Sequence, residues 1–335
     1  MPFTLSIIVP VHNGAATLAA CLEALNHGKD DGTEILVIDD RSTDGSAAIA
    51  QDAGVRAVPN AHARGPAGAR NHGAELASGD ILLFVDADVV VPKNAISLIR
   101  ETFAADPKVS AVFGSYDTEP AEPNFLSQYK NLFHHYVHQA AREDSSSFWA
   151  GCGAIRAAEF RKLSGFNEAD YPHPSIEDIE LGWRLSRSGG RIRLEKSLQA
   201  KHLKRWSATG LLKADILRRA LPWTRLIAVS GHTPNDLNLS SGQRISAALA
   251  WGCAVSAGLC LLPCCRPAAL CLAIACALGV IALNAGFYRF FLRHRGVMFT
   301  AGVFFWHLLY FLYSSAVFAI GWPCYRIRNR VTGRV

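Results

Sequence analysis

The stretch LFVDADVVV, residues 83–91, places two acids inside a run of apolar side chains. A short apolar run of this kind is typical of a strand buried in a sheet. Carboxylates in such a place are costly to desolvate unless a positive charge compensates them. Because Asp86 and Asp88 are two residues apart, they share one face if the segment is extended. The pattern predicts a buried strand over 80–88 that ends in a pair of acids needing a cation.

The segments that precede this strand alternate between strand and helix patterns. β-Branched apolar runs predict strands, and helical spacing with capping residues or glycine-rich entries predicts helices between them. The predicted strands are 4–11, 33–40 and 55–60, and the predicted helices are 16–26, 42–54 and 65–79. This alternation predicts an α/β domain with a doubly wound, mostly parallel sheet.

Carboxylates also end a second strand, in IDD at 38–40, and ligands of such sheets bind at the carboxyl ends of strands. We therefore expect the acids of 38–40 and 86–88 to converge on one edge. The first turn, PVHNGAAT, has a single glycine, and the chain contains neither GxGxxG after that strand nor GxxxxGK[ST]. A Rossmann dehydrogenase and a P-loop NTPase are therefore not supported.

The back half of the chain has a different composition. Residues 1–205 carry 21 basic and 26 acidic side chains, whereas 206–335 carry 13 basic and only two acidic ones. Three long runs there are apolar and free of Asp, Glu, Lys and Arg, and each is long enough to cross a bilayer: 245–265, 267–288 and 299–322. Buried core helices are the alternative, but three such runs would overfill a soluble core. The basic residues flank apolar runs, which favours a membrane and not nucleic acid as the partner.

Orientation and topology follow less directly. The segment 5–11 is short, lacks a basic flank and contains Pro10, so it is expected to be a strand and not a signal peptide. We therefore expect a cytoplasmic front half and an integral protein of the cell inner membrane. A third full span would place Arg326 and Arg334 outside, against the positive-inside tendency. Whether all three runs span, or one is re-entrant or interfacial, stays open.

Between the two halves, the segment 207–229 places Leu212, Ile216 and Leu217 on one side and adds several basic residues. It predicts an amphipathic helix or helix pair on the bilayer surface, with an ordinary packed helix as the alternative. The predicted organisation is a catalytic domain at 1–206, an amphipathic interfacial linker at 207–240 and a transmembrane region at 241–335. The chain has nine cysteines but no CxxC, so a metal cluster or disulfide framework is not expected.

The order of motifs resembles that of the family 2 glycosyltransferases. In sequence they are PVHNG, VIDDRSTDG, GPAGARNHG, VDAD, FWAGCGAIR, GFNE, EDIELGWRL and HLKRW, over about residues 4–206. The resemblance implies the GT-A fold and a hexosyltransferase of cell-envelope glycan synthesis. It also implies metal-dependent transfer of a sugar from a nucleotide-diphosphate sugar, expected to be a UDP-sugar.

The resemblance also implies roles for donor-side residues. Val11 matches the edge of the base pocket, Asp40 the acid that hydrogen-bonds the base, and Arg70 a residue near base and phosphates. Asp86 matches the position facing the sugar or ribose, and Asp88 the ligand of a Mg²⁺ or Mn²⁺ ion under the diphosphate. On this interpretation, the positive charge that compensates the two acids arrives with the substrate. A strand-end turn with solvated acids is the alternative for the Asp-x-Asp pair alone.

The Glu177–Asp178 pair lies in PSIEDIELGWRL. Acids favour helix N-termini whatever their function, which is the structural alternative. In the resembling family Asp178 is the general base, and Glu177 beside it is expected to raise its pKa. A single base without a second nucleophilic carboxylate is consistent with direct displacement and inversion.

The last motif, HLKRW, resembles the QxxRW motif of processive members, with His202 in place of Gln. This departure leaves processivity open, and it makes His202 either a further metal ligand or a structural residue. Arg205 and Trp206 are expected to contact phosphate and the acceptor sugar. Trp149 and Gly151 are expected in the acceptor-side loop, although a Trp at this position is also consistent with a core residue.

The acceptor follows from the base. A hydroxyl needs a general base, so the Glu-Asp pair favours a hydroxyl of a membrane-associated glycan or lipid. A polyprenyl phosphate, which brings an ionised nucleophile, is the enzymatic alternative. A membrane module that binds a nucleotide sugar without catalysis is the alternative of another class, and the presence of both acid motifs disfavours it.

Overall fold

The structure, a computed structural model, describes residues 3–230 and 241–332. The chain divides after Ser207 into two compact units, which are described separately below. The last part of the predicted linker, 231–240, and Arg334 lie outside the described residues.

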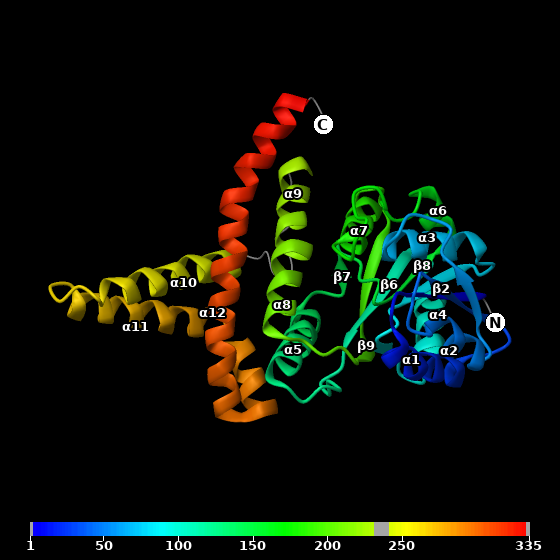
Figure 1. Cartoon of the computed structure of the whole chain (residues 1–335), viewed down its shortest axis with the longest axis horizontal. Coiled ribbons are helices and arrows are strands. Elements are labelled where there is room, and N and C mark those ends of the chain that lie inside the picture. Colours follow the sequence, from blue (N-terminus) through cyan, green and yellow to red (C-terminus); the bar gives the residue numbers. More distant parts are fainter. Residues whose placement is uncertain (1–2, 231–240, 333–335) are drawn as a thin grey trace. The chain divides into compact units, whose positions relative to one another are not determined.

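The first unit begins with the predicted alternation of strands and helices (Figure 1). Strands β1 (Leu5–Val11), β2 (Thr33–Asp39), β3 (Arg56–Pro59) and β4 (Ile81–Val85) are all parallel, with β1 between β2 and β4. The intervening helices are α1 (Ala15–Gly28), α2 (Ser46–Asp52) and α3 (Pro66–Leu76). The prediction of a doubly wound, mostly parallel sheet is confirmed for this half of the unit.

The sheet continues with strands that make it mixed. Its order is β3-β2-β1-β4-β8-β6-β9-β5, and β7 pairs with β9. Strand β8 (Cys152–Arg156) is antiparallel to β4 and β6, whereas β6 (Val109–Tyr116) and β9 (Arg191–His202) are parallel to each other. The remaining elements of the unit are β5 (Val89–Val90), α4 (Ala95–Ala105), α5 (Phe125–Ala140), β7 (Asp144–Ser145), α6 (Ala157–Lys162) and α7 (Glu177–Arg187).

Two cores lie on the two faces of this sheet. Alternate residues of a strand point to opposite faces, so Ile7 and Leu83 join the core that contains α1 and α4. Their neighbours Ile8 and Phe84 join the other core, which contains α3, α6 and α7. The near-continuous apolar character of β1 and β4 follows from burial on both faces.

The DAD segment departs from the predicted strand over 80–88. Strand β4 ends at Val85, and the next three residues form a turn in which the Val89 amide donates to the Asp86 carbonyl (3.0 Å). Antiparallel pairing of Val89 with His202 then begins β5. A turn does not place Asp86 and Asp88 on a common face, so each acid meets different neighbours.

The second unit consists of helices. They are α8 (Ala208–Asp215), a π-helical turn η1 (Ile216–Ala220), α9 (Leu221–Ser230), α10 (Ser241–Leu259), α11 (Arg266–Leu283) and α12 (Ala285–Thr332). Helix α12 is broken at Gly296, whose φ of 79° lies in the left-handed region. In the predicted amphipathic segment the buried residues include Leu211 and Ile227, whereas Leu217 is exposed.

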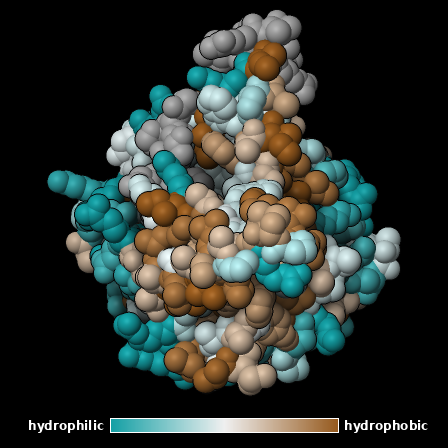
Figure 2. All heavy atoms as spheres, turned by 90° about the vertical axis from the view of Figure 1, so that its left-hand side faces the viewer, coloured by the Kyte–Doolittle hydropathy of each residue, from teal (hydrophilic) through white to brown (hydrophobic). Residues whose placement is uncertain are grey.

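Apolar side chains cover much of the surface of these helices. Figure 2 shows hydrophobic residues gathered on the face turned to the viewer, and the exposed large side chains include Leu261 and Leu278. Within the described residues, two helices are long and apolar enough to cross a membrane, Arg266–Leu283 and Ala285–Ile327. The run predicted at 245–265 contributes α10, which does not reach that criterion.

Candidate active site

The acids that end β2 and β4 lie at the carboxyl edge of the parallel strands. The Asp40 amide donates to the Val11 carbonyl (2.8 Å), which holds the ends of β1 and β2 together. Val11 itself is buried, so its side chain packs in the core and its backbone is what faces this edge. The Asp86 amide donates to the Gly151 carbonyl (3.2 Å), which joins the end of β4 to the segment before β8.

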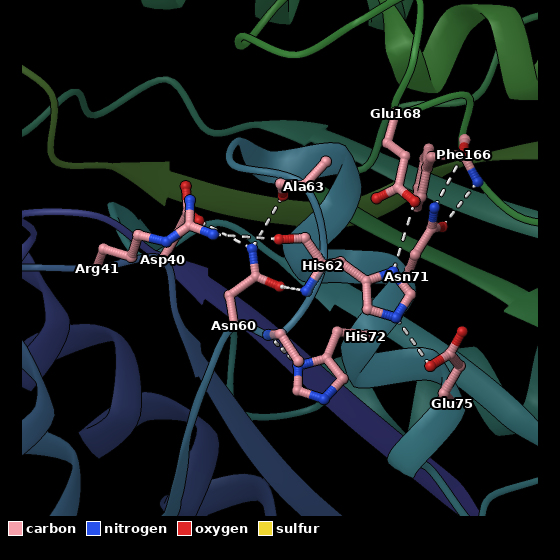
Figure 3. Close-up of polar contacts among 11 residues, drawn as sticks. Asp40, Arg41, Asn60, His62, Ala63, Asn71, His72, Glu75, Phe166 and Glu168 are labelled. Atoms are coloured by element: carbon pink, nitrogen blue, oxygen red, sulfur yellow. Dashed lines mark hydrogen bonds and ion pairs between the residues drawn. The ribbon is translucent and has the colours of Figure 1, made fainter.

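Asp40 organises the loop between β3 and α3 (Figure 3). Its carboxylate accepts a hydrogen bond from the Asn60 amide group on one oxygen and from the Gly65 backbone on the other, both at 2.8 Å. Asn60 also donates to the Ala63 carbonyl (3.1 Å). Gly65 has a φ of 117°, and a Cβ there would lie 2.4 Å from the Pro172 carbonyl oxygen, so only glycine fits. Asp40, the acid that the resemblance assigns to the base, thus fixes the loop between β3 and α3.

The same loop is tied to the segment after α6. The imidazole of His62 contacts Glu75 at 2.9 Å and Glu168 at 3.5 Å, one carboxylate at each ring nitrogen. Asn71 and Phe166 exchange two hydrogen bonds, in which the Asn71 side chain donates to a carbonyl (2.9 Å) and accepts from an amide (2.8 Å). These contacts hold the two loops against each other beside Asp40.

A histidine and an arginine extend this donor side. The Asp40 carbonyl can only accept, so Nδ1 of His12, 2.9 Å away, carries the proton. The neutral ring then accepts at Nε2 from Arg64 (3.2 Å). This arrangement places an arginine next to the β1–α1 turn, where a phosphate-bearing ligand of such a sheet binds.

Arg70 compensates two of the site acids. Its guanidinium donates to Asp86 (2.6 Å) and to Glu177 (2.9 Å), and its side chain is only 5% exposed. Burial raises the pKa of Asp86, and Arg70 opposes that rise. The expectation that the compensating charge arrives with a substrate is therefore wrong for Asp86, because α3 supplies a permanent one.

Asp88 has a different partner. Its Oδ2 lies 3.6 Å from Nε2 of His202, and the Leu203 amide donates to its backbone carbonyl (2.8 Å). Burial raises the pKa of Asp88, but His202 and Lys204 outweigh burial and hold that pKa below its ordinary value. The carboxylate is thus kept ionised, as a metal ligand must be.

The Asp88–His202 pair fits a divalent cation that takes its remaining ligands from a substrate. Across the described residues, no group of three or more His, Cys, Asp and Glu side chains is placed to hold an ion by itself. Mg²⁺ and Mn²⁺ commonly bind one or two carboxylates together with substrate phosphates and water. An ionised carboxylate and an imidazole facing each other are suitable donors for such a shared ion.

Asp178 lies in the first turn of α7, directly after Glu177. Burial raises its pKa to about 7, with Glu177 adding to the rise and Arg70 opposing it. Its two oxygens accept hydrogen bonds from the Ala150 amide (3.1 Å) and the Ile179 amide (2.8 Å). It remains partly exposed, whereas Glu177 is buried. A half-ionised, accessible carboxylate is suited to proton abstraction near neutral pH.

The residues predicted for the acceptor lie in two places. Trp149 and Gly151 flank Ala150, which binds Asp178, so they adjoin the acid pair. Trp206 is buried, and its backbone bonds to the start of α5 through Ser127 (2.7 Å) and Asn124 (2.9 Å). Arg205, with a side chain 73% exposed, pairs with Glu122 at 3.2 Å.

Sequence reasoning did not identify several of these residues. Asn60, His62 and Arg64 lie in a short NAHARG segment whose side chains have no motif spacing. Tyr116 ends β6 and contacts His202, but a tyrosine at a strand end carries no signal of its own. A preference for asparagine in loops was the only available indication for Asn60.

Residues 6–163 match the model of glycosyl transferase family 2. The motifs that carry the resemblance, the mixed sheet and the clustered acids all agree with that match. This part of the chain, which includes the DAD turn, is thus similar to glycosyl transferase family 2.

The relatives of the chain support this assignment. It is 27% identical over 207 residues to the pre-mycofactocin glycosyltransferase of Mycobacterium tuberculosis. That alignment covers 59% of this chain and 42% of the relative. It is 28% identical over 118 residues to WfgD, a glucosyltransferase of Escherichia coli. That alignment covers 34% of this chain and 46% of WfgD. The name of WfgD gives UDP-Glc as its donor and a GlcNAc-diphosphoundecaprenol as its acceptor. The chain thus spans less than half the length of these relatives.

Solved structures share the fold. The mannosyltransferase PcManGT of Pyrobaculum calidifontis, solved with GDP-Man and Mn²⁺, aligns with a TM-score of 0.58 at 19% identity. The alignment covers 95% of this chain and 88% of PcManGT. Glucosyl-3-phosphoglycerate synthase of Mycobacterium tuberculosis, solved with Mn²⁺, UDP and phosphoglyceric acid, aligns at 0.51 and 18% identity over 68% and 78%. The chain therefore has the GT-A fold.

Proposed function

We propose that this family 2 glycosyltransferase moves a sugar from a nucleotide-diphosphate sugar to a hydroxyl of a membrane-associated glycan or lipid, with inversion. A UDP-sugar is the donor we expect. The observation that carries the proposal is Asp178, a partly exposed carboxylate whose pKa is raised to about 7 beside the DAD turn. A phosphate nucleophile would not need such a base, because it is already ionised.

The proton-transfer step depends on the environment of Asp178. Its ionised form accepts the proton of the acceptor hydroxyl as the oxygen attacks the anomeric carbon. Hydrogen bonds from the amides of Ala150 and Ile179 orient the carboxylate. The high pKa makes it a stronger base than an ordinary aspartate while leaving about half of it ionised at pH 7.

The state of Glu177, the other carboxylate of the acid pair, supports inversion. Glu177 is buried, and its two oxygens accept hydrogen bonds from Arg70 (2.9 Å) and from the Ser175 amide (2.8 Å). A carboxylate held in this way cannot reach an anomeric carbon to form a covalent intermediate. This supports a single displacement by the activated hydroxyl, which would invert the configuration.

The donor side would be held by Asp40 with its loop, by Arg64 and by the Asp88–His202 pair. A divalent cation at Asp88 and His202 offsets negative charge on the departing nucleoside diphosphate when it is bound. Mn²⁺ in the related folds PcManGT and glucosyl-3-phosphoglycerate synthase supports this assignment. Arg70 already donates to Asp86 without the cation, and we assign this acid to sugar or ribose hydroxyls.

The second unit would anchor the enzyme in a membrane. Its two long apolar helices and the exposed side chains of Leu261 and Leu278 support this part of the proposal. A cytoplasmic catalytic unit in a cell inner membrane would bring the site to a lipid-linked acceptor.

The test is a donor panel with the full chain in detergent, Mn²⁺ and a native lipid extract, in which release of UDP and GDP is measured. We expect release of one diphosphate that depends on the extract and is lost in Asp178→Asn. If polyprenyl phosphate alone serves as acceptor and D178N retains full activity, transfer to a phosphate replaces transfer to a hydroxyl. Donor binding without any release in wild type would favour a non-catalytic module.

A further inference from the structure

His202 needs its ring held in one orientation if it is to face Asp88. Strand β9 ends at His202, and its backbone pairs with Val89, so the Cα position is fixed. The imidazole can still rotate about two side-chain bonds, and many rotations turn Nε2 away from the carboxylate. A ligand that must first be ordered binds its metal more weakly than one that is already oriented.

The ring of Tyr116 supplies that constraint. It stacks on the imidazole of His202 with centroids 4.3 Å apart and planes only 11° from parallel. Tyr116 ends β6, the strand parallel to β9, and its carbonyl accepts a hydrogen bond from His135 of α5 (2.7 Å). The backbone of Tyr116 is therefore anchored, and its ring lies flat against the predicted metal ligand.

Two more aromatic rings hold Tyr116 itself. His134 of α5 lies 4.4 Å from its centroid, and Trp149 makes an edge contact at 4.8 Å. The indole of Trp149 in turn lies against Gly151, where a Cβ would be 2.5 Å from the ring. Ala150, between Trp149 and Gly151, donates its backbone amide to Asp178. The rings of His202, Tyr116 and Trp149 therefore form a continuous contact that reaches the segment orienting the proposed base, Asp178.

We propose that Tyr116 is a positioning residue for the cation. Its ring holds the imidazole of His202 toward Asp88, so that the pair is preorganised before the nucleoside diphosphate binds. This inference rests on the proposed function, in which a divalent ion binds Asp88 and His202. Hydrogen-bonded partners that orient a metal-bound histidine typically alter metal affinity roughly 10- to 100-fold when removed, and we expect the lower end for a stacked ring.

The test measures Mn²⁺ binding, not turnover. The full chain in detergent is titrated with Mn²⁺ in the presence of UDP, and in parallel GDP, and free Mn²⁺ is followed by electron paramagnetic resonance. We expect Tyr116→Leu to weaken Mn²⁺ binding about 10-fold and Tyr116→Phe, which keeps the stacked ring, to change it less than about twofold. The nitrogen coupling of bound Mn²⁺ to an imidazole should decrease in Y116L and persist in Y116F.

Tyr129→Leu is the matched control. Tyr129 lies in α5, is 2% exposed and contacts Phe125 and Phe133, so its loss removes a buried aromatic ring that does not stack on His202. We expect Y129L to lower the melting temperature without changing Mn²⁺ affinity. An equal loss of Mn²⁺ affinity in Y129L and Y116L would assign the effect to general destabilisation and overturn the inference.

His202→Ala separates this inference from the proposed function. If H202A and wild type bind Mn²⁺ equally, the cation assignment in the proposed function fails, and the role of Tyr116 fails with it. If H202A weakens binding and Y116L does not, the role of Tyr116 alone is wrong. Equal weakening of Mn²⁺ binding in Y116F and Y116L would show that the hydroxyl of Tyr116 matters and not its stacked ring. That result would also overturn the positioning role of the ring.

Discussion

Replacement of Arg70 by methionine is the sharpest test of how the acids are compensated. Arg70→Met removes the positive charge that contacts Asp86 at 2.6 Å and Glu177 at 2.9 Å and keeps most of the apolar stem. Removing one partner of a buried ion pair costs about 3–5 kcal/mol, because a charge is left without compensation. Asp86 is one-third exposed and can be partly hydrated, so we expect the lower end, about 3 kcal/mol.

That loss has two measurable consequences. For a unit of about 200 residues each kcal/mol shifts the melting temperature by roughly 2–4 °C, so R70M should melt about 10 °C lower. Arg70 also lowers the pKa of Asp178, which stands at about 7. Its removal raises that pKa, so the fraction of ionised base at a given pH falls. The acidic limb of the rate profile should therefore move to higher pH.

The assay compares R70M with Arg184→Met on melting temperature and on the pH profile of diphosphate release. Arg184 lies in the same helix as Asp178 and pairs with Glu180 at 2.7 Å. R184M should also melt at a lower temperature, but its acidic limb should stay where wild type has it. An R70M variant with the wild-type limb and melting temperature would refute the reasoning. Arg70→Lys, which keeps the charge but lacks the two-pronged guanidinium, should fall between R70M and wild type.

Three further variants test other parts of the structure. Asp178→Asn should lower kcat by roughly 10²–10⁴-fold with donor Kd unchanged, and an unchanged kcat would contradict its role as base. The pKa of Asp178 is about 7 in the folded chain and roughly 3.9 in the unfolded chain, so ionisation of this carboxyl destabilises the folded state at high pH. D178N should therefore also raise the melting temperature at pH 8 and leave it unchanged near pH 4. Asn60→Ala removes donors to Asp40 and Ala63, so it should cost about 1–3 kcal/mol and raise donor KM more than it lowers kcat; an unchanged KM would contradict this. Leu278→Arg, at a side chain 60% exposed on α11, should reduce recovery in carbonate-washed membranes, and recovery equal to wild type would contradict a bilayer environment for α11.

The sequence was sufficient to predict the parallel half of the sheet, because that half is built from local signals. Strands such as β1 and β4 are apolar throughout, and the helices between them have regular spacing and glycine boundaries. The antiparallel insertion of β8 between β4 and β6 depends on pairing between residues about 70 apart, and no local pattern shows it. The turn at DAD was also missed, because an apolar run on both sides is equally consistent with a continuous strand.

The candidate site shows the same division. Acidic side chains at strand ends could be found from sequence because their desolvation cost makes them stand out. The resemblance named Arg70 but not its pairing with the acids, because Arg70 is 16 residues from Asp86 and 107 from Glu177 and its helical pattern gives no sign that it points inward. His202 carried a signal only through the altered QxxRW-like motif, and Tyr116 carried none.

The unequal partners of Asp86 and Asp88 also explain why a cation would bind at one acid and not between the two. Asp86 already pairs with the guanidinium of Arg70, whose positive charge would repel a divalent ion bound at that carboxylate. Asp88 faces an imidazole, which in its neutral form is a metal ligand. The turn after β4 directs the two side chains to these different neighbours. A divalent ion is therefore favoured at Asp88 and His202, and Asp86 is left as a hydrogen-bond acceptor for the donor sugar.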